Sequence, residues 1–80
     1  MNKYTIRAFG ITKDIIGQRQ LVVETAVHTV EGLKVVLLEK YPALSELRSL
    51  VVAVNNQYAD DHQVLKSEDE IALIPPVSGG

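Results

Sequence analysis

The chemistry that this sequence offers is concentrated at its carboxy-terminal end, which reads Ile74-Pro75-Pro76-Val77-Ser78-Gly79-Gly80. Proline has no backbone N–H, so the two prolines end any strand at Ile74 and favour an extended chain. The two glycines that follow make a thread thin enough to enter a narrow channel in another protein. We therefore expect a flexible tail over residues 75–80 that presents the carboxylate of Gly80 to a foreign active site.

A free carboxylate resists nucleophilic attack because it is negatively charged and has no good leaving group. Adenylation by ATP would remove both obstacles, but the sequence contains no glycine-rich phosphate loop. We therefore expect ATP to be used by an activating enzyme, and we expect this chain to bind no cofactor. The sequence predicts a carrier whose reactive atom is its own last carbon, rather than an enzyme that acts alone.

Other reactive groups are few and scattered. The absence of cysteine excludes a disulfide framework, a thiolate metal site and a cysteine nucleophile. His28 and His62 lie far apart in the sequence. Asp60, Asp61 and His62 are consecutive, and consecutive residues do not naturally face one metal ion, so a surface loop is expected there. The acidic run at 68–70 is expected to form an exposed turn, and no metal site is predicted.

Length and composition fit one small globular domain, since the 80 residues are 46% hydrophobic and 22% charged. The formal net charge of −2 argues against nucleic acid as a partner. No apolar run approaches the roughly 20 residues that span a bilayer, and the start has no signal-peptide pattern, so the cytoplasm is the expected location.

Residues 41–80 contain two basic and six acidic side chains. This half of the chain either attracts a basic partner or forms a solvated face.

The first part of the chain predicts a hairpin of two strands. Apolar and polar residues alternate over residues 3–9 and again around Leu21 and Val23, which is typical of half-buried strands. Residues 13–17 are expected to form one helical turn that ends at Gly17 in the left-handed region.

The middle of the chain predicts one main helix. Thr29 fits an N-cap, because its hydroxyl can accept from an early amide of the next turn. Apolar residues recur at helical spacing from Leu33 to Tyr41, and Pro42 cannot continue a helix. The competing interpretation is a buried strand over residues 35–38.

The last part predicts further strands. Residues 50–54 are apolar on both faces, as in a central strand, and residues 55–56 (Asn-Asn) suit a turn that tolerates positive φ. Tyr58 is expected to begin a short return strand, and residues 71–74 to form the last strand. The predicted class is an α+β domain over residues 1–74, in which a mixed sheet of four to five strands packs on one main helix. The first and last strands are expected side by side in its centre.

Three segments resemble those of a known family. The ending from Asp69 to Gly80, with its Pro-Pro-Val-Ser-Gly-Gly run, is the most specific, and it is supported by Ala53-Val54-Asn55 and by residues 9–17 (Phe-Gly-Ile-Thr-Lys-Asp-Ile-Ile-Gly). Over essentially its whole length the sequence resembles the MoaD family of ubiquitin-like sulfur carriers, the small subunits of molybdopterin synthase. The resemblance implies a β-grasp fold.

The resemblance also implies a reaction cycle. A MoeB-type adenylating enzyme would convert the Gly80 carboxylate to an acyl-adenylate, and a sulfur donor would turn that into a thiocarboxylate. The tail would then insert into the large synthase subunit, of the MoaE type, where sulfur passes to cyclic pyranopterin monophosphate. By position, the family's apolar contact surface corresponds here to Phe9, Tyr58 and Ile74.

The sequence departs from the family pattern at a few positions and leaves alternatives open. Glu68 replaces the usual glycine in the turn before Asp69, and Ile74 and Tyr58 stand where an aromatic and an aliphatic residue are common. The alternatives are a ThiS-type carrier for thiazole synthesis, a ubiquitin-like modifier joined to protein lysines, and a binding module with an inert tail. The Pro-Pro-Val-Ser run counts against the ThiS type.

Overall fold

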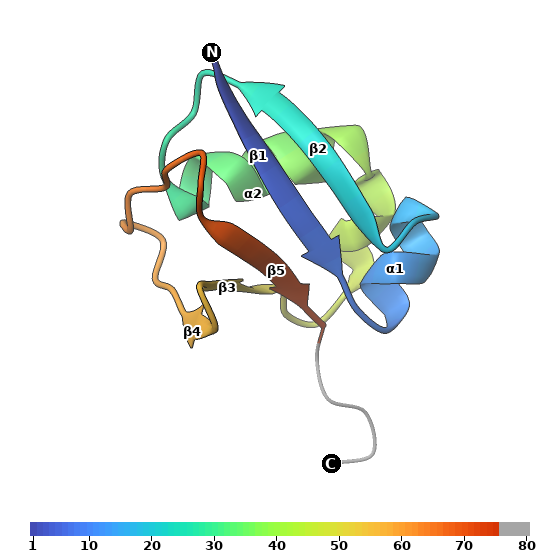
Figure 1. The fold of residues 1–80 in the computed structure, drawn as a ribbon. Coiled ribbons are helices and arrows are strands. Elements are labelled where there is room, and N and C mark those ends of the chain that lie inside the picture. Colours follow the sequence, from blue (N-terminus) through green and yellow to red (C-terminus); the bar gives the residue numbers. More distant parts are fainter. Residues whose placement is uncertain (76–80) are drawn as a thin grey trace.

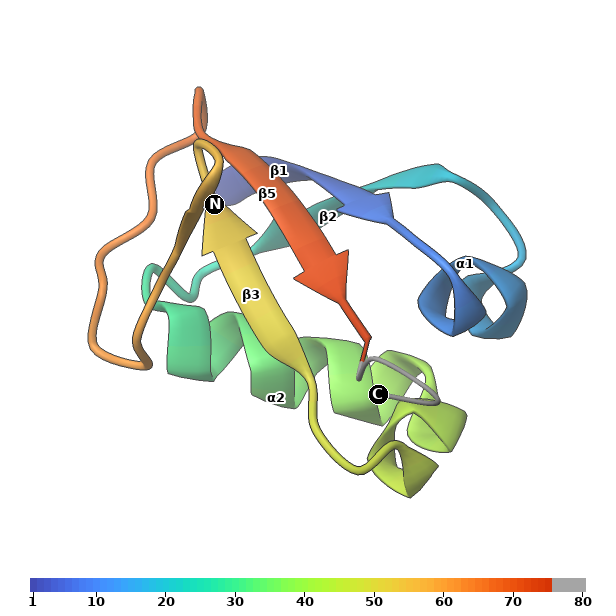
Figure 2. The ribbon, with the colours of Figure 1, turned by 90° about the horizontal axis from the view of Figure 1, so that it is seen from below.

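Five strands form one sheet, and one long helix crosses one face of it (Figures 1 and 2). The computed structural model describes residues 1–75. In chain order the elements are β1 (Asn2–Ala8), α1 (Ile11–Ile16), β2 (Gln20–Thr25), α2 (Val30–Lys40), the 3-10 helix η1 (Pro42–Glu46), β3 (Val51–Val54), β4 (Gln57–Tyr58) and β5 (Glu70–Ile74).

The strands lie in the order β2-β1-β5-β3-β4, so the first and last strands of the chain occupy the middle of the sheet. β1 pairs antiparallel with β2 and parallel with β5, and β5 pairs antiparallel with β3. The sheet is therefore mixed, and the predicted central pairing of the first and last strands is confirmed. With α2 packed on it, this is the β-grasp arrangement of ubiquitin-like proteins, as predicted.

The main helix begins and ends where the sequence predicted. The Thr29 hydroxyl accepts from the backbone N–H of Gly32 at 3.2 Å, which satisfies one of the free donors of the first turn. The helix ends at Lys40, two residues before Pro42. The competing interpretation of residues 35–38 as a strand is wrong, because these residues lie inside α2.

The connection between β1 and β2 contains the predicted helical turn. α1 ends at Gly17, which has a φ of 86° and donates its N–H to the carbonyl of Lys13 at 2.8 Å. A left-handed residue at this place reverses the chain. The hairpin therefore closes, and the backbone N–H of Ala8 donates to the carbonyl of Arg19 at 2.9 Å.

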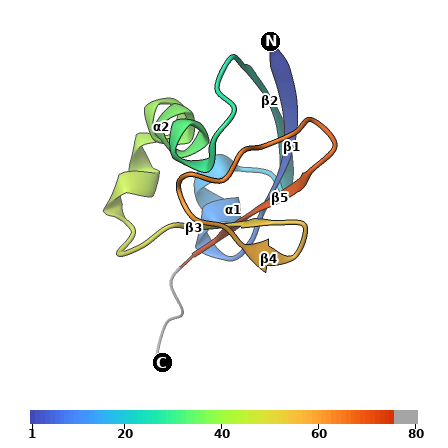
Figure 3. The same ribbon diagram turned by 90° about the vertical axis from the view of Figure 1, so that its left-hand side faces the viewer.

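The core lies between α2 and the inner face of the sheet, and Figure 3 shows these two layers from the side. On β1, Tyr4, Ile6 and Ala8 are buried, whereas Arg7 is exposed, as the alternation predicted. Full burial of an aliphatic or aromatic side chain of this kind stabilises the fold by about 1.5–3 kcal/mol. The other buried apolar residues of this core are Ile16, Leu21, Val23, Val30, Leu33, Leu37, Leu44, Val52, Val54, Leu65, Ile71 and Leu73.

The turn between β3 and β4 has the predicted left-handed residues, since φ is 53° at Asn55 and 68° at Asn56. The Asn55 side chain also ties this turn to the start of β5. Its Nδ2 donates to Asp69 Oδ1 and its Oδ1 accepts from the N–H of Glu70, both at 3.0 Å. Because of these contacts Glu70 joins β5, although the sequence suggested a turn there.

Asp69 closes the turn before β5, where Glu68 replaces the glycine that is usual in the family. The Asp69 Oδ2 accepts from the backbone N–H of Lys66 at 2.8 Å, and the backbone N–H of Asp69 donates to the Lys66 carbonyl at 3.0 Å. These two hydrogen bonds hold the turn in place.

Within residues 1–75 there is no helix that is long and apolar enough to cross a membrane. The last strand ends at Ile74, where the prolines were expected to end it. The remainder of the predicted tail, Pro76, Val77, Ser78, Gly79 and Gly80, lies outside the described residues.

Candidate functional site

Strand register places four side chains in one row across the outer face of the sheet, opposite α2. Arg7 of β1 pairs with Ala72 of β5, Ala72 pairs with Ala53 of β3, and Ala53 pairs with Tyr58 of β4. Side chains alternate along each strand, so this row points away from the buried row beneath it. The two short alanines leave a hollow between the longer side chains of Arg7 and Tyr58.

This hollow belongs to a groove of about 340 Å³, and all three residues predicted to contact a partner line it. Phe9 is 47% exposed, Tyr58 is 78% exposed, and Ile74 is half-buried. Arg7 and Glu70 supply polar edges. We call it the apolar groove. Exposed apolar side chains that converge from separate segments are typical of a binding surface.

Phe9 is held by a turn that the sequence analysis missed. The buried Thr12 hydroxyl accepts from the backbone N–H of Phe9 at 2.9 Å and donates to its carbonyl. Gly10 follows with φ 55° and ψ −132°, a conformation open to glycine. A Cβ on Gly10 would lie 3.2 Å from Cγ of Pro75, so this glycine leaves room for the first residue of the predicted tail. The glycine directly after the predicted strand was the sequence feature that could have indicated this turn.

A second groove, of about 470 Å³, lies beside the first and is lined by three cations, Arg7, Lys13 and Arg19. We call it the basic groove. The cations come from β1, from α1 and from the loop before β2, and the hairpin closure at Ala8 brings them together. Sequence spacing alone did not reveal this cluster. Arg7 and Phe9 line both grooves.

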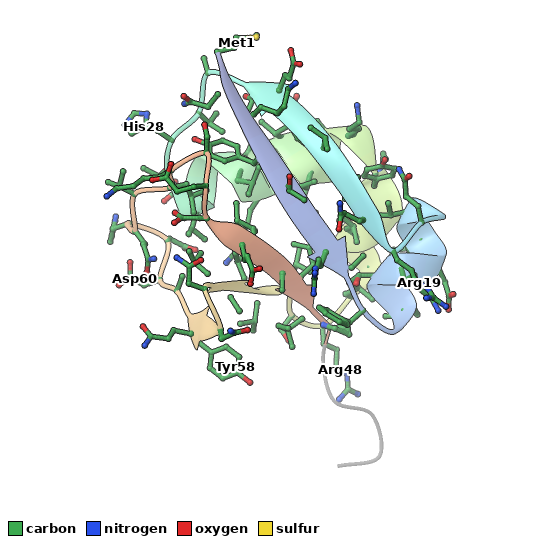
Figure 4. The ribbon with its side chains drawn as sticks, in the orientation of Figure 1. Met1, Arg19, His28, Arg48, Tyr58 and Asp60 are labelled. Carbon is green, nitrogen blue, oxygen red and sulfur yellow. The ribbon has the colours of Figure 1, made fainter. Side chains whose placement is uncertain are left out.

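The acidic loop at 60–62 has structural contacts instead of a metal-binding arrangement. Lys34 Nζ pairs with Asp61 Oδ1 at 2.9 Å, and Asp60 Oδ1 accepts from the backbone N–H of His62 at 2.8 Å. In the part of the chain that the structure describes, no group of three or more His, Cys, Asp or Glu residues could hold a metal ion. Figure 4 shows Asp60 on the opposite side of the molecule from Arg19.

Comparison with known proteins agrees with the fold. A sequence profile of the ThiS family matches residues 6–80. The molybdopterin synthase sulfur carrier subunit of Caenorhabditis briggsae is 42% identical over 76 residues, which cover 90% of this chain and 90% of that protein.

Solved structures give the same result. SAMP1 from Haloferax volcanii is 27% identical with a TM-score of 0.82, over 99% of this chain and 100% of that one. A Helicobacter pylori chain from the complex of subunits 1 and 2 of molybdopterin-converting factor is 28% identical with a TM-score of 0.68, over 98% and 99% of the two chains. This chain therefore belongs to the ThiS family and is a relative of molybdopterin synthase sulfur carrier subunits.

Proposed function

We propose that this chain is the sulfur carrier subunit of molybdopterin synthase and that Gly80 is its reactive residue. The observation that carries the proposal is the position of Ile74. This residue lines the apolar groove and also ends β5, so a protein bound at the groove meets the start of the tail. The similarity to curated sulfur carrier subunits supports the same assignment.

The proposed chemistry has three steps. In the first, the Gly80 carboxylate attacks the α-phosphorus of ATP in a MoeB-type enzyme, which gives an acyl-adenylate and pyrophosphate. In the second, sulfide-level sulfur from a donor attacks the acyl carbon and displaces AMP, which gives the thiocarboxylate without a change of oxidation state. In the third, the tail enters the large subunit and the thiocarboxylate sulfur forms a bond to a carbon of cyclic pyranopterin monophosphate, which gives a thioester. Water then breaks the acyl carbon–sulfur bond, so the sulfur stays on the substrate and the Gly80 carboxylate is restored.

The described residues support a binding role in this cycle rather than a catalytic one. The apolar groove presents Phe9, Tyr58 and Ile74 beside the start of the tail. Burial of such side chains by a partner would supply hydrophobic free energy. We propose that this groove contacts both the adenylating enzyme and the large subunit.

The first experiment measures the intact mass of the chain after incubation with its adenylating enzyme, ATP and a sulfur source. We expect one oxygen to be replaced by sulfur, and we expect this change to disappear when Gly80 is deleted. An unchanged mass in the wild-type chain would refute the carrier chemistry and favour a module with an inert tail.

The second experiment identifies the pathway. The thiocarboxylated chain is mixed with the large synthase subunit and cyclic pyranopterin monophosphate, and molybdopterin is measured. Its formation supports the proposal. Thiocarboxylate that persists without molybdopterin would contradict it and would favour the ThiS-type carrier of thiazole synthesis.

A ubiquitin-like modifier is a second candidate, because this chain is similar to SAMP1, described as small archaeal modifier protein 1. The same mass measurement separates the two functions. Isopeptide-linked adducts on protein lysines as the main product would favour the modifier, whereas thiocarboxylate without such adducts would favour the carrier.

A further inference from the structure

The basic groove gathers three cations, and Glu70 lies with one of them, Arg7, in the adjoining apolar groove. Arg7, Lys13 and Arg19 line it, and its other lining residues are uncharged. Within residues 1–75, the two ion pairs join Lys3 to Glu24 and Lys34 to Asp61. The three groove cations take part in neither.

The position of the basic groove limits the kind of partner surface that can cover it. Arg7 and Phe9 line both grooves, so a partner that buries Phe9 also lies against Arg7. A cation that loses water without gaining a carboxylate is costly to bury. A partner that covers Lys13 and Arg19 as well as Phe9 therefore binds more favourably if it places negative charge over the basic groove.

We propose that the basic groove binds an acidic segment of the large synthase subunit, and that this contact sets the rate at which the two subunits associate. The inference rests on the proposed function, and the large subunit is chosen because the related H. pylori chain was solved in complex with its second subunit. Complementary charge acts mainly on the association rate, because it attracts the partner before contact is made. The acidic loop at 60–62 lies on the opposite side of the molecule from Arg19 of this groove (Figure 4).

The test compares two triple variants with the same change in net charge. In the groove variant, Arg7, Lys13 and Arg19 are replaced by Gln; in the control, the replaced residues are Lys3, Lys40 and Lys66, which lie outside both grooves. Association of each with the large subunit is followed by stopped flow at low and high salt. We expect the groove variant to associate at least about tenfold more slowly at low salt. We expect the control to stay within about twofold of wild type.

Three further measurements distinguish an effect of lost charge from an effect of misfolding, and identify which partner the basic groove binds. The charge-conserving double variant Arg7→Lys with Arg19→Lys should associate within about threefold of wild type, and all variants should unfold at similar temperatures. A groove variant that associates with the large subunit as fast as the control overturns the inference. Slowing of adenylation alone, with normal large-subunit association, also overturns it. A wild-type chain that never acquires sulfur refutes the proposed function instead.

Discussion

Asn55 illustrates how one polar residue joins two parts of the sheet. Its backbone turns the chain between β3 and β4, while its side chain bonds to Asp69 and Glu70 fourteen and fifteen residues away. The turn chemistry is visible in the sequence. The bonds to Asp69 and Glu70 are not, because they depend on β3 and β5 lying side by side in register.

Replacing Asn55 by Gly should destabilise the protein by about 1–2 kcal/mol, because two side-chain hydrogen bonds are lost while the left-handed backbone remains accessible. Asn56→Gly is the matched control, since Asn56 has a similar φ of 68° and makes no side-chain hydrogen bond within residues 1–75. Urea unfolding of both variants measures the difference. Equal stabilities would show that the bonds to Asp69 and Glu70 contribute nothing.

Substitution of Gly17 would test the cost of backbone strain without a change in packing. A Cβ at this position would meet no atom within 4 Å, but φ is 86°. Gly17→Ala should therefore cost about 1–2 kcal/mol, and Gly17→Asn should cost less because asparagine visits this region more readily. Thermal and urea unfolding measure both. An alanine variant as stable as wild type would mean that the end of α1 can rearrange freely.

The helix α2 contains a glycine whose role comes from packing rather than from helix propensity. Gly32 lies in the first turn of α2, and a Cβ there would come within 2.9 Å of Cβ and 3.2 Å of Cγ1 of Val27. The Val27 segment is held in place, since its carbonyl accepts from the Tyr4 hydroxyl at 2.8 Å.

Gly32→Ala should therefore destabilise the protein, although glycine to alanine inside a helix ordinarily stabilises it by about 1 kcal/mol. The expected sign is reversed because Val27 cannot move aside without breaking its contact with Tyr4. Urea unfolding gives the sign, and Gly32→Ala should cost less in a Val27→Gly background, where the Cβ that it would meet at 2.9 Å is absent. A more stable single variant would contradict this account of the packing.

At the level of the molecule, the proposed function gives the two faces of the sheet separate roles. The inner face and α2 form the core, and the outer face presents the apolar groove beside the end of β5. A substitution on the outer face should change binding and leave folding almost unaffected.

Tyr58→Ala should weaken binding to the large subunit at least about tenfold, as for an aromatic residue at the centre of an interface. Its unfolding free energy should change by less than about 0.5 kcal/mol, because the side chain is 78% exposed. Val35→Ala is the control, since Val35 is 49% exposed on α2 and should leave binding unchanged. Calorimetric titration measures the affinity, and equal affinities for the two variants would remove Tyr58 from the proposed interface.

Features that depend on near neighbours in the chain were predictable from the amino-acid sequence. Alternation over residues 3–9, the cap at Thr29, the left-handed glycine at 17 and the end of the last strand at Ile74 all follow from local chemistry. The family resemblance and the choice of Phe9, Tyr58 and Ile74 as one surface also came from the sequence.

Contacts between side chains of separate elements required the three-dimensional fold. Arg7, Lys13 and Arg19 line one groove because α1 closes the hairpin and the register fixes the outer row. Gly10 faces Pro75 because β1 and β5 run parallel and end together. The contact between Gly10 and Pro75 depends on strand pairing across more than sixty residues, and local preferences contain no information about that register.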